Sequence, residues 1–328
     1  MPATEACPDQ GVPGPARAVR AVIHVPPREE AAPAMPSTAP TWDPGQYLRH
    51  AGHRARPFAD LLARVPELPD GGGRRPVIAD LGCGPGNVTR LLADRWPTAL
   101  ITGLDNSPQM LEQARREQAG PTPAGGRIEF APADARTWAP EEPLDLIISN
   151  ATLQWVPGHP DSFPAWFDGL APGGVLAFQV PGNFDAPSHA LMRELAASER
   201  WRGRLGAVLR HTDAVLEPAG YLDRLLALGA EADVWETTYL HLLPGDDPVL
   251  DWVKGTGLRP VLAALDDDTD AREAFLAEYR DLLRAAYPRT PHGTVLPFRR
   301  IFAVAVKRAD EAADGAVGTE GTDGKGAR

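Results

Sequence analysis

The apolar residues of the chain fall into two alternating patterns, short continuous runs and runs spaced at helical period. A continuous apolar run at 77–79 ends at Asp80, and three glycines follow at 82, 84 and 86. Beyond the glycines, apolar side chains recur at the i, i+3, i+4 and i+8 positions of one helix face: Val88, Leu91, Leu92 and Trp96. This stretch predicts a strand, a glycine loop and a helix.

The same alternation continues to about residue 181. Further strands are predicted at 100–104, 128–131, 144–149 and 175–180. Ser107 can cap a helix that has Pro108 in its first position. The segment 170–174, which ends in two glycines, is interpreted as the end of a helix before the strand at 175–180. Strands that alternate with helices indicate a parallel sheet covered on both faces.

The second half of the chain completes this sheet and adds two inserts. A helix is expected at 217–230 and strands at 234–242 and 300–307. The predicted fold is α/β, a doubly wound and mostly parallel seven-stranded sheet of Rossmann-like type. The inserts, at about 182–216 and 243–297, leave the sheet near its expected ligand-binding edge, and the second contains helical stretches at 248–265 and 271–287. We expect the inserts to form a helical cap.

The two ends of the chain lack a sustained apolar pattern. Residues 1–40 are rich in Pro and Ala, and residues 308–328 are rich in Gly, Ala and Asp. Such segments do not bury enough apolar surface to order themselves, so both are predicted to be disordered. The ordered domain is placed at 41–307, opening with a helical segment at 41–64. The first 34 residues are either an ordinary extension or precede a true start at Met35.

Composition excludes several classes of function. The formal net charge of −11 and the sequence pI of about 5.2 argue against a nucleic-acid partner. Cys7 and Cys83 are too few for a disulfide framework, which fits a reducing cytoplasm. No apolar run reaches the roughly 18 residues of a membrane span. The histidines are scattered rather than paired, so no metal is predicted.

The glycine loop is the main candidate for a ligand site. Glycine lets backbone approach a ligand closely, and ligands of α/β sheets bind at the carboxyl ends of strands. Asp105, at the end of the second strand, can accept hydrogen bonds from both hydroxyls of a ribose, which indicates a nucleoside cofactor. A dinucleotide fingerprint needs a sixth-position glycine or alanine where this chain has Asn87. A nicotinamide cofactor therefore remains only an alternative.

The pattern Asp80-Leu81-Gly82-Cys83-Gly84-Pro85-Gly86 resembles the D-x-G-x-G-x-G loop of class I methyltransferases, which bind S-adenosyl-L-methionine. The resemblance implies that an acid in the position of Asp134 receives the adenine amino group, and that the methyl group is delivered near Asn150, Gln154 and Trp155. The predicted cofactor-binding residues are Asp80, Gly82, Cys83, Gly84, Gly86, Asp105, Asn106, Asp134, Ala135 and Asn150.

Longer segments resemble a narrower family, the trans-aconitate 2-methyltransferases. They are WDPGQYLRH, NATLQWV, QVPGNFDAPSH, WETTYLHLL followed by WVKGTGLRP, and LPFRRIFAVA, and they extend over most of 42–307. The resemblance implies a carboxyl O-methyltransferase that forms the monomethyl ester of trans-aconitate or a similar polycarboxylate. A carboxylate with a reference pKa near 4 is already ionised at neutral pH, so this reaction needs no general base.

A substrate with three carboxylates calls for several cations near the inserts. Arg259 and Arg299 are the first candidates because a guanidinium fork matches a carboxylate. Lys254, His241 and Tyr47 come next, and Gln154 and Trp155 complete the predicted substrate residues. The flanks of the inserts also hold His189, Arg193 and Arg300. We expect a small-molecule substrate and a monomeric enzyme.

Two other classes of function stay open. The same fold could methylate a different acid, such as a malonyl thioester on a carrier protein, or an oxygen or nitrogen of a secondary metabolite. A carrier protein would favour a basic docking face, and the net charge of −11 argues mildly against it. A third reading is a non-enzymatic module that only binds the cofactor. The intact acids Asp80, Asp105 and Asp134 argue against a decayed site.

Overall fold

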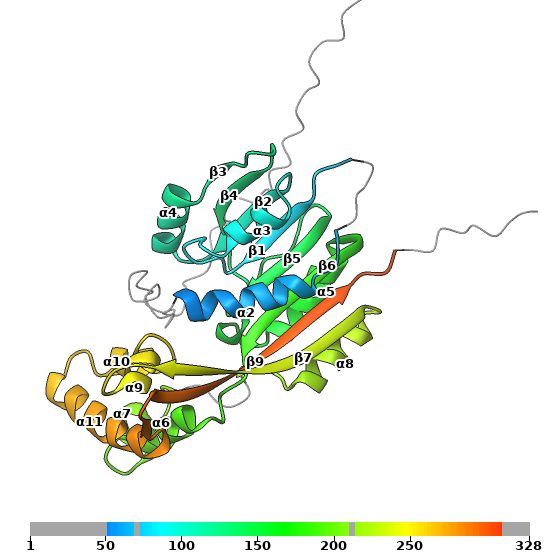
Figure 1. The fold of residues 1–328 in the computed structure, drawn as a ribbon. Coiled ribbons are helices and arrows are strands. Elements are labelled where there is room, and N and C mark those ends of the chain that lie inside the picture. Colours follow the sequence, from blue (N-terminus) through cyan, green and yellow to red (C-terminus); the bar gives the residue numbers. More distant parts are fainter. Residues whose placement is uncertain (1–50, 69–72, 210–213, 310–328) are drawn as a thin grey trace, which may run out of the picture.

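A computed structural model describes residues 51–68, 73–209 and 214–309, and in it nine strands pair into one sheet (Figure 1). The order of the main path is β3-β4-β2-β1-β5-β6-β9-β7, and β8 pairs with β9. The strands are β1 (Val77–Leu81), β2 (Leu100–Asp105), β3 (Gly120–Pro121), β4 (Arg127–Pro132), β5 (Leu144–Asn150), β6 (Leu170–Pro181), β7 (Glu231–Leu243), β8 (Arg289–Thr290) and β9 (Gly293–Val306).

This sheet confirms the predicted doubly wound architecture. The strands β4, β2, β1, β5 and β6 are parallel, and β9 is antiparallel to both β6 and β7. Apart from β3 and β8, which have two residues each, every strand corresponds to one that the sequence predicted. The carboxyl ends of the parallel strands therefore meet at one edge, where the glycine loop also lies.

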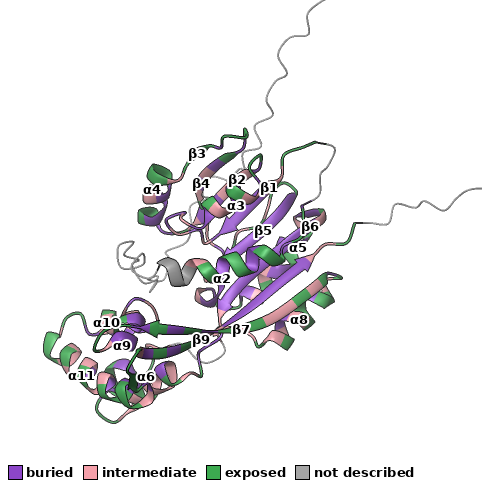
Figure 2. Cartoon of the chain, viewed as in Figure 1, coloured by how far each residue is buried: buried purple, intermediate pink, exposed green. Residues whose placement is uncertain are grey.

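Helices cover both faces of the sheet because successive strand side chains point to opposite sides. On one face α2 (Ala51–Arg64), α3 (Thr89–Arg95) and α4 (Pro108–Glu117) bury apolar side chains against Ile78 and Ile101. On the other, α5 (Phe163–Asp168) and α8 (Pro218–Ala227) pack against Ile147 and Leu176. The central strands are accordingly buried (Figure 2).

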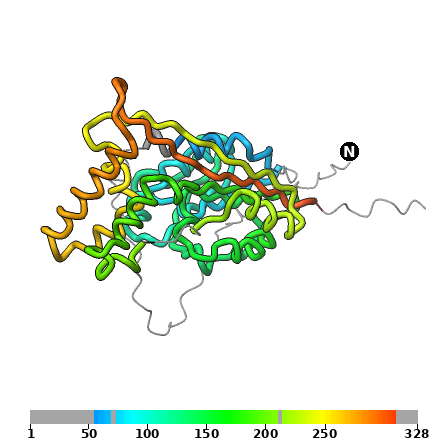
Figure 3. The backbone as a smooth tube through the Cα atoms, turned by 90° about the horizontal axis from the view of Figure 1, so that it is seen from below, coloured from blue at the N-terminus to red at the C-terminus, as the bar shows by residue number. Residues whose placement is uncertain are grey.

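The inserts build a separate helical layer beyond one end of the sheet (Figures 1 and 3). Its own core is centred on Trp201, Trp252, Phe275 and Phe298. The helices are α6 (Pro187–Ala197), α7 (Arg202–Leu205), α9 (Pro248–Lys254), α10 (Arg259–Ala264) and α11 (Thr269–Ala286). The stretch expected as one helix at 248–265 is thus two helices, α9 and α10.

Strands β7 and β9 extend beyond the rest of the sheet and connect it to this helical layer. The two strands pair from Glu231 and Val306 to Leu243 and Thr294, whereas the pairing of β9 with β6 ends at Arg300. Strand β9 therefore begins earlier than the predicted residue 300. The early part was missed because Pro297 argues against a strand. It is tolerated here because β9 has lost β6 as a neighbour at that point.

The interpretation of 170–174 as a helix end is wrong. Helix α5 ends at Asp168, and β6 already begins at Leu170, which pairs with Leu144. The two glycines are held by strand-like hydrogen bonds, since the amide of Gly173 donates to the Lys307 carbonyl and the amide of Lys307 donates to the Gly174 carbonyl. These residues are extended because they pair with the end of β9, a contact between distant segments that the local sequence does not reveal.

Candidate active site

The glycine loop between β1 and α3 combines tight packing with one open position. Gly82, Gly84 and Gly86 have φ angles of +78°, +57° and +77°, which favour glycine. A Cβ atom on Gly82 would lie 2.1 Å from Thr152 Oγ1, and one on Gly86 would lie 2.6 Å from the Phe130 ring. At Gly84 nothing lies within 4 Å. The packing requires the outer two glycines, and the middle one leaves room for a ligand.

Asp80 lies near the end of β1, directly before this loop, and its carboxyl group is fully buried. Its Oδ2 accepts a hydrogen bond from Thr89 Oγ1 at 2.6 Å, and its Oδ1 has no hydrogen-bond partner among the residues that the structure describes. Burial raises the pKa of the Asp80 carboxyl to about 7, although the Thr89 hydrogen bond opposes the shift. A buried oxygen without a partner is costly, and it fits a site that receives a donor from a ligand.

Asp105 ends β2 and faces the same loop. Its Oδ2 accepts from the Gly84 amide at 2.9 Å, and its Oδ1 accepts from the Ser107 amide at 2.8 Å. Burial raises the pKa of the Asp105 carboxyl, while these backbone hydrogen bonds lower it. Each carboxylate oxygen can accept a second hydrogen bond. Asp105 is thereby held in place with acceptor capacity left for two hydroxyl groups.

The remaining predicted cofactor residues lie at the same edge of the sheet. Asp134 follows β4, and its pairing with Arg136 lowers the pKa of the Asp134 carboxyl. Its neighbour Ala135 is buried, and Asn106 is exposed directly after β2. Cys83 is buried within the loop, and burial raises the pKa of its thiol. The strand ends therefore present carboxylates to one region, which suits a ligand that carries hydroxyl and amino groups.

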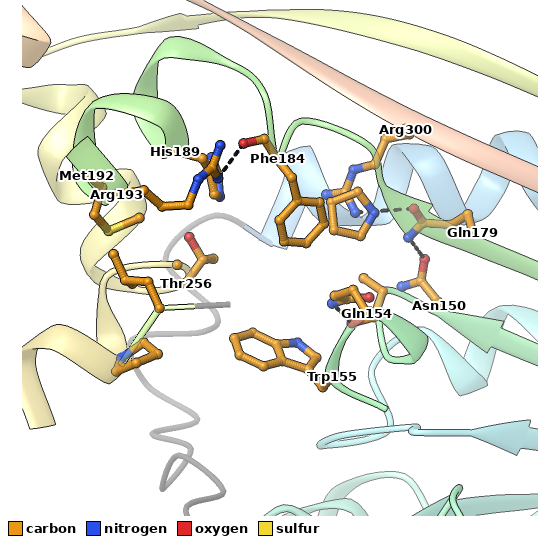
Figure 4. Close-up of a pocket in the computed structure, with 15 residues that line it drawn as sticks. Asn150, Gln154, Trp155, Gln179, Phe184, His189, Met192, Arg193, Thr256 and Arg300 are labelled. Atoms are coloured by element: carbon orange, nitrogen blue, oxygen red, sulfur yellow. Dashed lines mark hydrogen bonds between the residues drawn. The ribbon is translucent and has the colours of Figure 1, made fainter. Parts of the chain in front are cut away.

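A pocket opens beside this loop, between the sheet and the insert helices (Figure 4). It encloses about 910 Å³ including its open mouth. Its lining residues Asn150 and Ala151 lie between Ser149 and Thr152, which are bonded to the strand end and glycine loop at Leu81 and Gly82. Ser149 Oγ donates to the Leu81 carbonyl at 2.7 Å, and Thr152 Oγ1 donates to the Gly82 carbonyl at 3.1 Å. The lining residues are Asn150, Ala151, Gln154, Trp155, Gln179, Pro181, Phe184, His189, Met192, Arg193, Leu209, Thr256, Gly257, Pro260 and Arg300.

One wall of the pocket is a chain of polar side chains from β5, β6 and β9. Arg300 is only 5% exposed, and its Nη1 donates to Gln179 Oε1 at 3.2 Å. Gln179 Nε2 then donates to Asn150 Oδ1 at 2.5 Å (Figure 4). The Arg300 guanidinium carbon also lies 4.6 Å from the Phe298 ring centroid. A buried cation is thus fixed at the pocket wall by an amide and an aromatic ring.

The loop after β5 brings two more side chains into the pocket. Ala151 has a φ of +55°, which is uncommon for a residue other than glycine, and its amide donates to the Gln179 carbonyl at 2.9 Å. Gln154 Nε2 donates back to the Ala151 carbonyl at 2.5 Å. The tight turn aims Gln154 and Trp155 at the cavity (Figure 4).

The opposite wall comes from the first insert. Arg193 on α6 donates from Nη1 to the Phe184 carbonyl at 2.7 Å, and its Nη2 lies 3.6 Å from Asp185 Oδ1. The His189 ring lies 5.7 Å from the Phe184 ring, with Ser188 Oγ 3.2 Å from its Nδ1. A side chain on Gly257 would come within 3.0 Å of His189 Nε2. The pocket therefore has basic side chains on both walls.

Comparisons with known proteins agree with this geometry. Residues 78–174 match the model of a methyltransferase domain. A protein of Streptomyces coelicolor is 74% identical over 273 residues, which cover 83% of this chain and 89% of that protein. A protein of Streptomyces avermitilis is 72% identical, and the match covers 84% of this chain and 100% of that protein. A protein of Mycolicibacterium gilvum is 48% identical, and the match covers 80% of this chain and 98% of that protein. All three are named trans-aconitate 2-methyltransferase.

The chain belongs to the trans-aconitate 2-methyltransferase family. It is an S-adenosylmethionine-dependent methyltransferase, and the observed residues fit this cofactor. Three features suit a ligand with a ribose and a cationic amino-acid end: the open space at Gly84, the remaining acceptor capacity of Asp105, and Asp80 Oδ1, which has no partner within the described part of the chain.

Among the substrate residues predicted from the resemblance to this family, the structure brings Gln154 and Trp155 to the pocket. Arg299 is not among the lining residues, because it forms ion pairs with Glu217 and Glu236 outside the pocket. Lys254 pairs with Asp251 at 3.4 Å. These side chains lie beside the trans-aconitate 2-methyltransferase pocket rather than in it.

The other three candidates have different positions. His241 is buried in the insert core, with its ring 4.9 Å from that of Trp252. Arg259 is the first residue of α10, next to the lining residue Pro260. Tyr47 lies outside the described residues. Of the described candidates in this group, neither His241 nor Arg259 is among the residues that line the pocket.

The pocket is also lined by His189, Arg193 and Arg300, which the sequence analysis named on the insert flanks without choosing them as substrate residues, and by Gln179 and Phe184, which it did not consider. A signal for them did exist, because four of the five fall within the family-like segments QVPGNFDAPSH and LPFRRIFAVA. The choice between Arg299 and Arg300 depends on strand register. Neighbouring residues of a strand point to opposite faces, so only one of the two can face the pocket.

Proposed function

We propose that this protein transfers a methyl group to one carboxylate of trans-aconitate or a similar polycarboxylate. The observation that carries the proposal is the buried Arg300 guanidinium on the wall of a pocket that adjoins the glycine loop. A buried cation that lines a cavity favours an anionic ligand. The names of the relatives, which share up to 74% of their residues with this chain, support the choice of trans-aconitate.

Asp80, Asp105 and the backbone at Gly84 hold the cofactor in this proposal, and Asp134 contacts its adenine. S-adenosylmethionine supplies an electrophilic methyl group, so that a substrate carboxylate becomes a methyl ester and S-adenosylhomocysteine is released. The carboxylate is already ionised near neutral pH, with a reference pKa of about 4, so no protein group has to remove a proton.

The pocket residues supply position and charge. Asn150, which the family resemblance had grouped with the cofactor residues, ends β5 next to β1, and Arg300 lies on β9, two strands farther along the sheet. In this proposal both orient the reacting carboxylate, while Arg193 and His189 on the opposite wall pair with distant carboxylates. Good positioning of two reactants contributes about 7–11 kcal/mol to a reaction of this kind. Removing water from an anion is costly, and the cations on both walls offset that cost.

The remaining predicted substrate residues take outer roles in the proposal. Arg259, beside Pro260 at the pocket, is the best placed of them to attract a polycarboxylate at the mouth. Arg299, Lys254 and His241 stabilise the surrounding structure through their observed contacts. Tyr47, which lies outside the described residues, stays a candidate substrate residue on the family resemblance alone.

We also propose that the enzyme acts as a monomer in the cytoplasm. Among the described residues, no helix has the length and apolar character that crossing a bilayer requires. The single cysteine in the described part, Cys83, is buried and unpaired with another cysteine, as expected in a reducing compartment.

A turnover assay tests the function. Purified protein is mixed with S-adenosylmethionine and, separately, with trans-aconitate, cis-aconitate, citrate and isocitrate, and the ester and S-adenosylhomocysteine are measured by mass spectrometry. We expect a monomethyl ester formed preferentially from trans-aconitate. Methylation of a thioester-linked malonyl group or of a secondary metabolite, with none of the four acids methylated, would replace this proposal. Cofactor binding without any turnover would favour a non-enzymatic module.

A further inference from the structure

The hydrogen bonds of the pocket wall have a direction that the cation sets. A guanidinium group carries only donors, so the Gln179 atom that lies 3.2 Å from Arg300 Nη1 is its amide oxygen. The amide nitrogen of Gln179 then points to the other side and donates to Asn150 Oδ1 at 2.5 Å. One charged residue therefore fixes the orientation of two neutral amides, which alone could turn either way.

The consequence appears at Asn150. Its side-chain oxygen accepts from Gln179, so the group that its side chain presents to a ligand is the NH₂, which only donates. Asn150 and Arg300 both line the pocket, with Gln179 between them (Figure 4). Both ends of the chain thus offer donors to the same cavity. An ionised carboxylate has only acceptors and matches both donors, whereas a protonated amine has only donors and matches neither.

We propose that Gln179 is a positioning residue that makes the pocket selective for an ionised carboxylate. Gln179 is 1% exposed on β6, and its amide, which Arg300 orients, fixes the orientation of the Asn150 amide. The inference rests on the proposed function, because it explains how that site recognises the reacting group. It also gives Gln179 a role distinct from filling space in the sheet.

Two variants separate polarity from packing. Gln179→Glu keeps the shape but accepts at both ends, so Asn150 must turn its NH₂ toward Glu and its oxygen toward the pocket. The new carboxylate also neutralises part of the Arg300 charge. Gln179→Met keeps a similar length and removes both hydrogen bonds without reversing either one. A packing role predicts that the Glu variant is the milder, since Glu is isosteric with Gln. The polarity role predicts that it is the more harmful.

The test is calorimetric titration of trans-aconitate into protein saturated with S-adenosylhomocysteine. We expect Gln179→Glu to weaken binding by about 30-fold or more and Gln179→Met by about fivefold, in line with the loss of charge-assisted hydrogen bonds. The KM should rise more than kcat falls. Affinity for S-adenosylhomocysteine should stay within about twofold in both variants, because Asp80, Asp105 and the Gly84 backbone, which hold the cofactor in the proposed function, are unchanged, and Asn150 is assigned to the carboxylate substrate.

Gln113→Glu is the matched control, because it adds the same charge on the outer surface of α4, where Gln113 donates to Glu117. It should change trans-aconitate affinity by less than about twofold, because exposed charges are screened. If Gln179→Glu loses S-adenosylhomocysteine binding through misfolding, Asn150→Asp is measured in its place. That variant still accepts from Gln179 and turns a second acceptor toward the pocket, so it should also weaken trans-aconitate strongly.

The inference is overturned if Gln179→Glu, or Asn150→Asp in its place, binds trans-aconitate with the same affinity as Gln179→Met. The proposed function would still stand. Wild-type protein that binds none of the polycarboxylates contradicts the proposed function itself. The two failures are thus read from different samples.

Discussion

The two halves of the site present opposite chemistry. The glycine-loop half is built from carboxylates at strand ends, Asp80, Asp105 and Asp134, and offers acceptors. The pocket half offers the Arg300 and Arg193 guanidinium groups and, by our inference, the Asn150 amide as donors. Ligands of opposite polarity can therefore bind side by side without competing for the same groups. The border between the halves runs along the end of β5, at Asn150.

The halves also differ in how they are built. The acidic half is marked by local signals, because each acid lies at or within two residues of the end of a strand and the glycines directly follow Asp80. The donor half joins β5, β6, β9 and α6, and the connection from Gln179 to Arg300 spans 121 residues. This contrast suggests variants that should affect one half and leave the other unchanged.

The largest effect is expected from Arg300→Met. Loss of a desolvated cation should lower kcat/KM for trans-aconitate by about 100-fold or more. The matched control is Arg299→Met, which removes exposed ion pairs with Glu217 and Glu236 and should change kcat/KM by less than about threefold. Steady-state kinetics on both variants checks the pair. Equal losses would show that Arg299 also acts on substrate and that the pocket assignment is incomplete.

A smaller effect, confined to the other half, is expected from Asp105→Asn. The variant keeps the shape but turns one acceptor into a donor that faces either the Gly84 amide or the ribose. Affinity for S-adenosylhomocysteine should fall by about 10- to 100-fold, since a mismatched buried polar group costs about 1–3 kcal/mol. Titration calorimetry gives the value. A fall in trans-aconitate affinity of the same size would show that the halves are not separate.

Two glycines of the loop separate the effect of a substitution on cofactor binding from its effect on folding. Gly86→Ala should lower the free energy of unfolding by about 2–4 kcal/mol, because its Cβ would overlap the Phe130 ring and its φ is +77°. Gly84→Ala has open space, so only its φ of +57° should cost stability, about 1 kcal/mol. Denaturant unfolding measures both. Gly84→Ala should instead weaken cofactor binding, and a variant with unchanged cofactor affinity would remove Gly84 from the site.

The smallest expected effect is a dependence of cofactor binding on pH. Burial raises the pKa of the Asp80 carboxyl to about 7 in the free protein, so that below this pH the group is mostly protonated and neutral. The cationic end of the cofactor favours the ionised form, and binding must lower this pKa. Affinity should therefore rise with pH up to about 7 and then level off, with proton release on binding near pH 6.

Calorimetry of S-adenosylhomocysteine binding in two buffers of different ionisation enthalpy measures this proton release. Asp80→Asn should abolish it, because the amide does not titrate. Proton uptake by the wild-type protein, or release that persists in Asp80→Asn, would assign the titration to another group.

Sequence reasoning predicted the acidic half more completely than the donor half, for physical reasons. The acids and glycines are local signals, since a strand end and a tight turn are encoded by adjacent residues. Arg299 and Arg300 show the limit for the other half. Both stand in one strand, and only the register of β9 against β6, with Arg300 opposite Pro181, decides which of them lines the pocket. A shift of one residue would exchange their positions.

The insert helices illustrate a second limit. Their existence followed from helical spacing, but the break between α9 and α10 and the early start of β9 at Gly293 depend on packing between segments far apart in sequence. His189 and Arg193 could be recognised as basic residues of the first insert. Their approach to the wall formed by Arg300 depends on how the insert packs against the sheet, which no short segment encodes.

The most direct test of the division into two halves is one set of four affinities. S-adenosylhomocysteine is titrated into Arg300→Met and Asp105→Asn, and trans-aconitate is titrated into the same variants at saturating S-adenosylhomocysteine, with the wild type as reference. The account predicts that Arg300→Met loses only trans-aconitate affinity and that Asp105→Asn loses only S-adenosylhomocysteine affinity. If either variant weakens both ligands to a similar extent, or if the wild type does not bind trans-aconitate, the account is contradicted.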